Sequence, residues 1–301
     1  MSGKAVKINF KKKLNRDDGW AWLMLAPNVI GFLMFMLVPM AATFVLSFMQ
    51  YDMLTPARFV GSDNYKTLIH DPIVWEVTWN TIVYTILTVP IGLCLSLLLA
   101  VALDNIRHFK RFFRGAYFLP SITSMVVVAI VWQWIYNPEY GIFNWVLSWF
   151  GIPAQKWLTS SATSLLSLAI VGIWKKLGYD MIIFLGGLQG ISTSYYEAAQ
   201  LDGASKVQIF LRITVPLLRP TIMFAFIMAM ISSFQVFDQV SLMTKGGPGR
   251  SSSVLVHYLY QNAFQYFKMG YACAIAYLLF AIVLILTAIN MRQEKRMREI
   301  Y

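Results

Sequence analysis

The sequence predicts an all-α membrane protein that crosses the bilayer six times, with both termini on the cytoplasmic side. Hydrophobic residues make up 58% of the 301 residues and charged residues only 13%, whereas a soluble domain has about 25% charged residues. Six apolar runs reach the roughly 20 residues that a helix needs to span the hydrocarbon core. Basic residues gather in alternate connections between these runs, which indicates the orientation.

The six expected spans lie at 21–49, 77–103, 115–136, 163–190, 217–243 and 269–291. The first follows three lysines and so resembles a signal peptide. Its apolar run is too long for a cleaved signal and no small-residue cleavage site closes it, so we expect a retained helix. The expected organisation is one transmembrane domain, 21–291, between a basic cytoplasmic N-terminus, 1–20, and a basic cytoplasmic tail, 292–301.

The orientation follows from lysine and arginine placement. Six of these residues lie in 1–20, four in 104–114, three in 191–220 and four in the C-terminal tail, while the opposite connections hold six in total. The side with more lysine and arginine residues is expected to be cytoplasmic.

The net charge of +11 would suggest nucleic-acid binding in a soluble protein. Here the charge lies in loops between spans, so we expect the lipid bilayer as partner and no nucleic acid.

Several kinds of chemistry find no support in the sequence. Cys94 and Cys273 lie inside apolar runs and the three histidines are scattered, so no metal site is expected. The glycine-rich stretch 246–251 lacks the Gly-Lys-Ser/Thr ending of a phosphate-binding loop. No catalytic triad or carboxylate pair is evident, and we do not expect an enzyme.

A polar segment, Glu197–Pro220, interrupts the apolar sequence between two spans. Ser194 and Glu197 have the spacing of a capping box, which predicts that a helix begins there. Gly203 permits a sharp backbone turn. A short helix, a bend and a second helix at the membrane surface are therefore expected.

The second half of this segment has two faces and a proline ending. An apolar face is expected from Ala204, Val207, Phe210 and Leu211. Two prolines, Pro216 and Pro220, are expected to end the element and start the next span. The alternative interpretation is an amphipathic loop that lies on lipid headgroups.

The residues of this segment resemble the EAA signature of the ABC importer permeases, the membrane subunits of binding-protein-dependent uptake systems. The resemblance rests on Glu197-Ala198-Ala199, Asp202-Gly203-Ala204, Phe210, Ile213, Pro216-Leu217 and Pro220. It extends over the whole 24-residue segment. The one departure is Val215, where the family more often has leucine.

Further stretches resemble the carbohydrate-uptake branch of that family, which is related to the maltose and glycerol-3-phosphate permeases. They are Val60–Tyr65, Asp71-Pro72, Trp79-Asn80-Thr81, Phe118-Leu119-Pro120, Leu185–Ile191, Phe237-Asp238 and Thr244–Gly249. Together they cover about residues 60–250. The resemblance implies a permease subunit that moves a sugar, oligosaccharide or related polyol into a bacterial or archaeal cell by alternating access.

The same resemblance implies the partners and the docking residues. ATP and magnesium would bind to a separate pair of ATPase subunits, a second permease chain would complete the pathway, and an extracytoplasmic solute-binding protein would deliver the solute. By matching position, the residues expected to dock on the ATPase are Glu197, Ala198, Ala199, Asp202, Gly203 and Ala204. No cofactor is expected in this chain itself.

Two other classes stay open from the residues alone. An ion-coupled secondary transporter would show repeat symmetry and membrane-embedded carboxylates, and it would give no reason for the EAA segment. A non-transporting membrane scaffold would not co-purify with an ATPase.

Polar and aromatic residues inside the spans are candidates for the solute pathway, because such groups in a membrane usually face a cavity or a partner. They are Asn80, Tyr84, Gln133, Trp174, Lys175, Lys176, Tyr179, Asp180, Gln235 and Asp238. The two lysines would suit an acidic sugar or a phosphorylated polyol. If the 163–190 helix is bent or begins later, they lie instead at an interface.

The connection 137–162 contains Trp145, Trp149 and Trp157. These side chains are expected in an interfacial aromatic belt or on a short surface helix. Docking of an external partner is the alternative.

Overall fold

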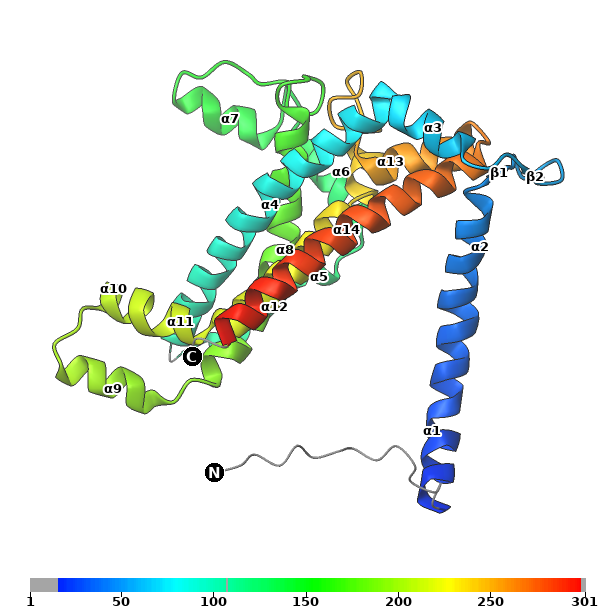
Figure 1. Ribbon diagram of the computed structural model, residues 1–301. Coiled ribbons are helices and arrows are strands. Elements are labelled where there is room, and N and C mark those ends of the chain that lie inside the picture. Colours follow the sequence, from blue (N-terminus) through cyan, green and yellow to red (C-terminus); the bar gives the residue numbers. More distant parts are fainter. Residues whose placement is uncertain (1–15, 107, 299–301) are drawn as a thin grey trace.

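The structure of the protein, a computed structural model, describes residues 16–106 and 108–298 (Figure 1). The helices of the first half are α1 (Arg16–Phe32), α2 (Val38–Leu46), α3 (Asp63–His70), α4 (Pro72–Asp104), α5 (Lys110–Ile122), α6 (Met125–Ile135) and α7 (Ile142–Trp149). Those of the second half are α8 (Ser164–Gln189), α9 (Thr193–Leu201), α10 (Lys206–Ile209), α11 (Val215–Leu217), α12 (Arg219–Phe234), α13 (Leu255–Tyr260) and α14 (Met269–Arg298).

Short elements complete the described part of the chain. The π-helical segments are η1 (Leu33–Leu37), η2 (Phe210–Thr214), η3 (Val240–Thr244) and η4 (Gln261–Gln265). A small antiparallel hairpin joins β1 (Met49–Gln50) to β2 (Arg58–Phe59), with Met49 opposite Phe59. The protein is therefore mostly helical, as the sequence predicts.

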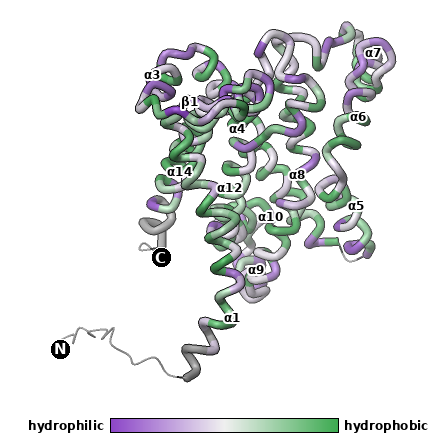
Figure 2. Tube along the Cα trace, turned by 90° about the vertical axis from the view of Figure 1, so that its right-hand side faces the viewer, coloured by the Kyte–Doolittle hydropathy of each residue, from purple (hydrophilic) through white to green (hydrophobic). Residues whose placement is uncertain are grey.

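The long helices α4, α8, α12 and α14 form a bundle (Figure 1). Helices α9 and α10 project from one end of it, and α3, α7 and α13 lie at the other end. Figure 2 shows hydrophilic stretches gathered at the end with α3 and α7. Large apolar side chains such as Ile86, Leu95 and Leu98 remain exposed along α4, which is typical of helices that lipid surrounds.

The core of the bundle consists of apolar side chains from α4, α8 and α12. They are Val89, Leu93, Ala100, Leu103, Met181, Phe184, Leu185, Leu188, Leu218, Ala225 and Ala229. Packing is close because small residues meet where helices cross. On α8, a methyl group added at Gly178 would overlap the Tyr117 carbonyl oxygen of α5.

By length and composition, three described helices could cross a membrane, or five if each of two bent pairs counts as one span. The pairs are α5 with α6, bent by 97°, and Lys206–Leu217 with α12, bent by 69°. Helix α8 has the length of a span, but it carries three charged residues near its middle. The count of six spans thus remains a prediction.

The expected spans 115–136 and 217–243 are each interrupted and do not form single helices. Between α5 and α6 the backbone of Thr123 and Ser124 is extended, and α12 ends at Phe234, before η3 begins at Val240. Ser121, Thr123 and Ser124 lie at the first break and Gln235, Asp238 and Gln239 at the second, but the apolar residues on both sides keep the average hydropathy high.

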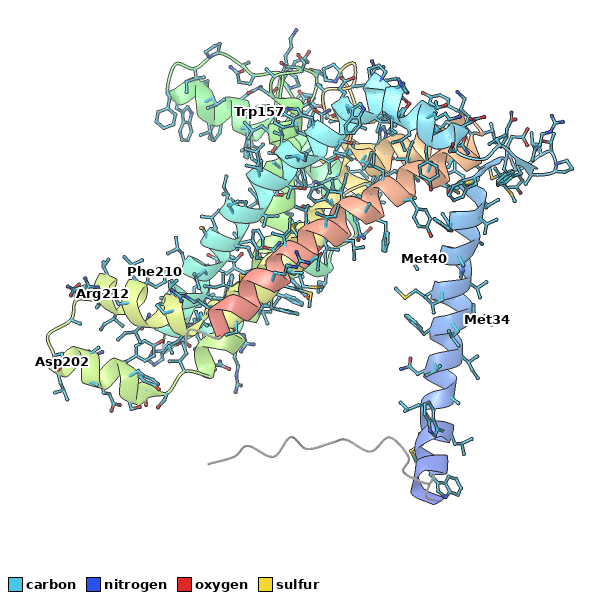
Figure 3. All side chains as sticks on the ribbon, viewed as in Figure 1. Met34, Met40, Trp157, Asp202, Phe210 and Arg212 are labelled. Atoms are coloured by element: carbon cyan, nitrogen blue, oxygen red, sulfur yellow. The ribbon has the colours of Figure 1, made fainter. Side chains whose placement is uncertain are left out.

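The first apolar helix runs apart from the bundle. None of the Trp22–Leu46 stretch is buried inside the chain, and Figure 3 shows Met34 and Met40 on this separate helix. It meets the bundle near its C-terminal end, where the Tyr277 hydroxyl donates to the Met40 carbonyl oxygen at 2.7 Å. The Phe44 and Tyr277 rings also pack there, with centroids 5.0 Å apart.

Asp71 joins three elements at the end of the bundle that holds α13. Its carboxylate caps α4 by accepting from the Ile73 N–H at 2.9 Å, and it accepts from the hydroxyls of Tyr258 at 2.8 Å and Tyr271 at 2.7 Å. Partial burial raises the pKa of Asp71, but hydrogen bonds from Tyr271 and Tyr258 outweigh burial and leave the pKa below its usual value. The stabilisation is therefore present above the unfolded pKa and is lost as the pH falls through the folded pKa.

We expect Asp71→Ala to lower the free energy of unfolding by about 1–3 kcal/mol, because two buried hydroxyls and a helix cap lose their acceptor. Thermal melting of the purified protein in detergent at pH 7 measures this. Asp63→Ala is the matched control, since Asp63 makes only an exposed ion pair with Lys66. The difference between Asp71→Ala and the unmodified protein should shrink below about pH 4, and a difference independent of pH would contradict the assignment.

Candidate functional site

Residues 193–217 form a projecting arm, here called the elbow, at one end of the bundle. Helix α9 runs outward, residues 202–205 turn, and α10, η2 and α11 return to α12. Figure 3 shows Asp202 near the tip of the elbow and Phe210 and Arg212 on the returning limb. The two limbs touch where the Thr214 hydroxyl donates to the Tyr196 hydroxyl oxygen at 3.4 Å.

The turn at the tip of the elbow is a hydrogen-bonded helix end. The Ala204 N–H donates to the Ala199 carbonyl oxygen at 2.9 Å, and the Gly203 N–H donates to that of Gln200 at 3.1 Å. This is the pattern of a Schellman motif, which needs a left-handed residue after the helix. Gly203 supplies it with φ +76°, so the predicted sharp turn at this glycine is confirmed.

The predicted capping box at Ser194 and Glu197 is wrong. The cap of α9 is Ser192, whose hydroxyl accepts from the Ser194 N–H. Ser192 has extended backbone, whereas Ser194 already lies in the first turn. A capping box does occur one helix later, between Ser205 and Gln208.

The predictions for Pro216 and Pro220 are confirmed where the chain returns from the elbow to the bundle. Pro216 lies in the first turn of α11 and Pro220 in the first turn of α12. Proline is tolerated in a first turn because the N–H it lacks has no acceptor there. The chain bends by 69° between these two helices.

The outer surface of the elbow combines acidic and small residues. Glu197, Ala198, Asp202 and Gly203 are exposed, whereas Ala199 is only 8% exposed and faces inward. The expected apolar face is not covered by the chain, because Val207 is 65% and Leu211 58% exposed.

A hollow of about 310 Å³ lies inside the bend of the elbow. Its lining residues are Asp202, Gly203, Ala204, Gln208, Ile209, Arg212 and Ile213.

A second site is a cavity of about 410 Å³ near the middle of the bundle, here called the central cavity. Helices α4, α5, α6, α8 and α12 and the segment after α12 supply its walls. The lining residues are Tyr84, Thr88, Val89, Gly92, Ser121, Met125, Gly172, Ile173, Lys175, Lys176, Tyr179, Asp180, Ala229, Ser232, Ser233, Gln235, Val236, Phe237, Asp238 and Gln239.

The central cavity brings together seven of the ten pathway candidates. These are Tyr84, Lys175, Lys176, Tyr179, Asp180, Gln235 and Asp238. Both lysines line the cavity because α8 is continuous from Ser164 to Gln189. The alternative of a bent or late-starting helix, with both lysines at an interface, is therefore wrong.

The other three candidates do not line the central cavity. Asn80 donates to the carbonyl oxygens of Arg250 and Ser253, both at 3.0 Å. Gln133 donates to the Leu242 carbonyl oxygen at 3.0 Å. These amides tie α4 and α6 to the segment that follows α12.

Trp174 is the third candidate outside the cavity. Its ring packs against Trp132, with centroids 5.4 Å apart. Its contact is with another aromatic side chain of the bundle.

Gln239, Thr88, Ser232 and Ser233 line the cavity and were not singled out from the sequence. The Gln239 amide donates to the Tyr84 hydroxyl, which joins the segment after α12 to α4. Gln239 follows Gln235 by four residues, and this spacing could have indicated that the two side chains lie on the same face of the segment. The small hydroxyl residues carry no comparable signal, because each can bond to its own helix.

Lys175 also braces the break between α5 and α6. Its ammonium donates to the carbonyl oxygens of Thr123 at 2.7 Å and Pro120 at 3.2 Å. In return, the Ser121 hydroxyl donates to the Lys175 carbonyl oxygen at 2.9 Å. A cation stabilises a helix C-terminus because the last carbonyl groups lack partners within the helix.

The connection 137–162 contains the predicted short surface helix, α7. Trp145 and Trp149 are exposed on it, with ring centroids 4.3 Å apart. Trp157 instead packs against Tyr136 and Phe143, and its indole N–H donates to Asn144 Oδ1 at 2.9 Å. The inclusion of Trp157 in a membrane-facing belt is therefore wrong.

An apolar helical bundle with a central cavity that several charged and polar side chains line, and with a projecting elbow, is the architecture of a membrane transport subunit. Residues 78–299 match the family of binding-protein-dependent transport system inner membrane components. The chain belongs to this family, and it is the permease component of an ABC transport system.

The similarity to individual permeases extends over nearly the whole chain. The chain is 35% identical to the sulfoquinovosyl glycerol transport system permease protein SmoG of Agrobacterium fabrum, covering 94% of this chain and 95% of SmoG. It is 31% identical to the trehalose/maltose transport system permease protein MalF of Thermococcus litoralis, covering 97% and 99%. A solved bacterial ABC transporter that imports the acidic polysaccharide alginate contains a similar chain, with a TM-score of 0.82 and 26% identity over 93% of this chain and 96% of that one.

Proposed function

We propose that the protein imports a sugar, oligosaccharide or related polyol through the central cavity, driven by a separate ATPase that docks on the elbow. The observation that carries this proposal is the elbow itself, in which a hydrogen-bonded turn presents small and acidic side chains on the segment that joins α8 to α12. The relatives are permeases of carbohydrate transport systems, which supports the solute class.

The elbow has the mechanical properties that coupling requires. Its Schellman turn, its capping box and the contact between Thr214 and Tyr196 leave it little freedom to bend. A force applied at Glu197 or Asp202 would therefore move α12, which forms one wall of the central cavity. A flexible loop would absorb the same force.

The proposed partners are those expected for the family. One subunit of an ATPase pair that binds ATP and Mg²⁺ would bind at the elbow, with Glu197, Ala198, Asp202 and Gly203 in contact and Ala199 and Ala204 supporting the turn. A second permease, expected to be a different chain, would close the open side of the central cavity. A solute-binding protein would dock at the end with α3 and α7.

The proposed topology has six spans and both termini in the cytoplasm of a bacterial or archaeal cell. It takes α8, the bent pair of α5 and α6, and α12 with the segment after it as spans, and it leaves the elbow outside the membrane. The elbow and the C-terminal end of α14 lie at the same end of the bundle (Figure 1), which supports a common cytoplasmic side. The ion-coupled transporter and the scaffold are disfavoured by membership in the permease family.

The experiment is co-expression of the permease with its ATPase subunits. We expect Glu197→Arg to reduce retention of the ATPase on the purified permease by about tenfold or more, because a charge reversal in a docking surface costs several kcal/mol. Glu139→Arg, at an exposed site between α6 and α7, is the matched control and should retain the ATPase. Full retention by Glu197→Arg would contradict docking at the elbow.

A further inference from the structure

The charged side chains of the central cavity balance one another. Among the described residues that line it, the charged ones are Lys175, Lys176, Asp180 and Asp238. Lys175 interacts electrostatically with Asp238, and Lys176 with Asp180. The lining therefore has no net charge, although the lysines considered alone would favour an acidic solute.

Lys175 is already engaged by the protein. Its bonds to the Thr123 and Pro120 carbonyl oxygens use two of the three N–H donors of an ammonium group. Withdrawing it would leave the end of α5 without these partners. Lys175 therefore holds the break between α5 and α6 and is not free to neutralise an anionic solute.

Asp180, unlike Lys175, has a polar atom that the protein leaves without a hydrogen-bond partner. The residue is only 3% exposed and lines the central cavity. Its Oδ1 atom has no hydrogen-bond partner among the residues that the structure describes. Lys176, one helical turn away, acts on it through charge. A buried carboxylate oxygen without a donor is costly, and far more so inside a membrane.

We propose that Asp180 accepts a hydrogen bond from a hydroxyl group of the transported solute, and that this solute is neutral and polyhydroxylated. The inference rests on the proposed function. Asp180 Oδ1 is itself buried, so a solute hydroxyl supplies the donor that it lacks when the carboxylate turns toward the cavity. An anionic solute would instead meet two carboxylates, with Lys175 occupied and Lys176 already balanced.

The other polar groups of the cavity fit the same ligand chemistry. Thr88, Ser232 and Ser233 supply neutral hydroxyls, and Gln235 supplies an amide. Such groups can both donate to and accept from a sugar hydroxyl. The relatives do not decide the question, because their names include both a sulfosugar derivative and neutral disaccharides.

The test uses the full complex of both permeases, ATPase and binding protein in proteoliposomes. The neutral radiolabelled probes are maltose, trehalose, lactose and arabinotriose, and the acidic probes are sulfoquinovosyl glycerol and an alginate trisaccharide. We expect import of a neutral probe. Asp180→Asn and the charge-balanced Asp180→Asn/Lys176→Gln should each lower kcat/KM for it by about tenfold or more. Asp104→Asn, at the C-terminal end of α4 and outside the central cavity, is the matched control and should not change it.

Monodeoxy analogues of the imported probe separate ligand contact from a structural role. In the unmodified complex, kcat/KM for one analogue should be lower than kcat/KM for the intact probe, by about the factor that Asp180→Asn costs with the intact probe. The Asp180→Asn complex should import that analogue and the intact probe with the same kcat/KM. If Asp180 had only a structural role, Asp180→Asn would lower kcat/KM by the same factor for every analogue.

The outcomes distinguish this inference from the function on which it rests. Preferred import of an acidic probe, wild-type kinetics of Asp180→Asn, or a uniform loss across analogues would overturn the inference and leave sugar import standing. Import of none of the six probes would overturn the proposed sugar import, and the inference with it.

Discussion

Replacing Gly203 with proline is expected to lower ATP-driven uptake strongly while the permease still inserts and folds. Gly203 has φ +76° and donates its N–H to the Gln200 carbonyl oxygen. Proline holds φ near about −65° and has no N–H, so the Schellman turn at the tip of the elbow cannot form. Energetic coupling between sites is commonly about 1–3 kcal/mol, so uptake should fall by about 5- to 150-fold.

Uptake and ATP hydrolysis are measured together in proteoliposomes. Gly203→Asn is the control, because asparagine tolerates the left-handed conformation and nothing lies within 4 Å of an added Cβ. We expect Gly203→Asn to keep most of the uptake. Equal activity of the proline and asparagine variants would refute a coupling role for the rigid turn.

The second large effect is expected at the crossing of α5 and α8. Gly178→Val should prevent recovery of folded permease, because its Cβ would overlap the Tyr117 carbonyl oxygen. Overpacking usually costs about 1–3 kcal/mol where side chains can yield. Here the obstacle is backbone, and the Lys175 and Ser121 bonds hold the two helices together at the same place.

Yield of monodisperse protein and its thermal melting in detergent measure this effect. Gly186→Ala, also on α8, is the matched control because nothing lies within 4 Å of the added methyl group. It should melt at or slightly above the temperature of the unmodified protein. A Gly178→Val protein with unchanged yield and melting temperature would show that the α5–α8 contact contributes little to stability.

Features with a local cause were predictable from the sequence. Apolar length located the long helices, since a span needs a run of such residues. Gly203 predicted the turn and Pro220 the start of α12, because each restricts only its own backbone. The cap of α9 was misplaced by two residues, since several serines near that helix could serve as caps and only backbone conformation distinguishes them.

The break between α5 and α6 was not predictable in this way. Pro120, Ser121, Thr123 and Ser124 lie at the break, but such residues also occur inside continuous helices, as Pro90 does in α4. The break is stabilised from a distance, by Lys175 of α8, which follows Pro120 by 55 residues. A span that is apolar on average can therefore bend at such residues where another element satisfies the freed carbonyl groups.

The sequence by itself determined that this protein is a helical membrane protein, because composition is a property of the chain alone, and the resemblance of residues 197–220 to the EAA signature indicated the permease family. Only the tertiary structure decided which polar residues share a cavity. It separated Lys175, bound to the end of α5, from Asp180, whose Oδ1 finds no donor among the described residues. Both are polar residues of one apolar helix, and their difference depends on contacts with α5 and with the cavity, which no local pattern encodes.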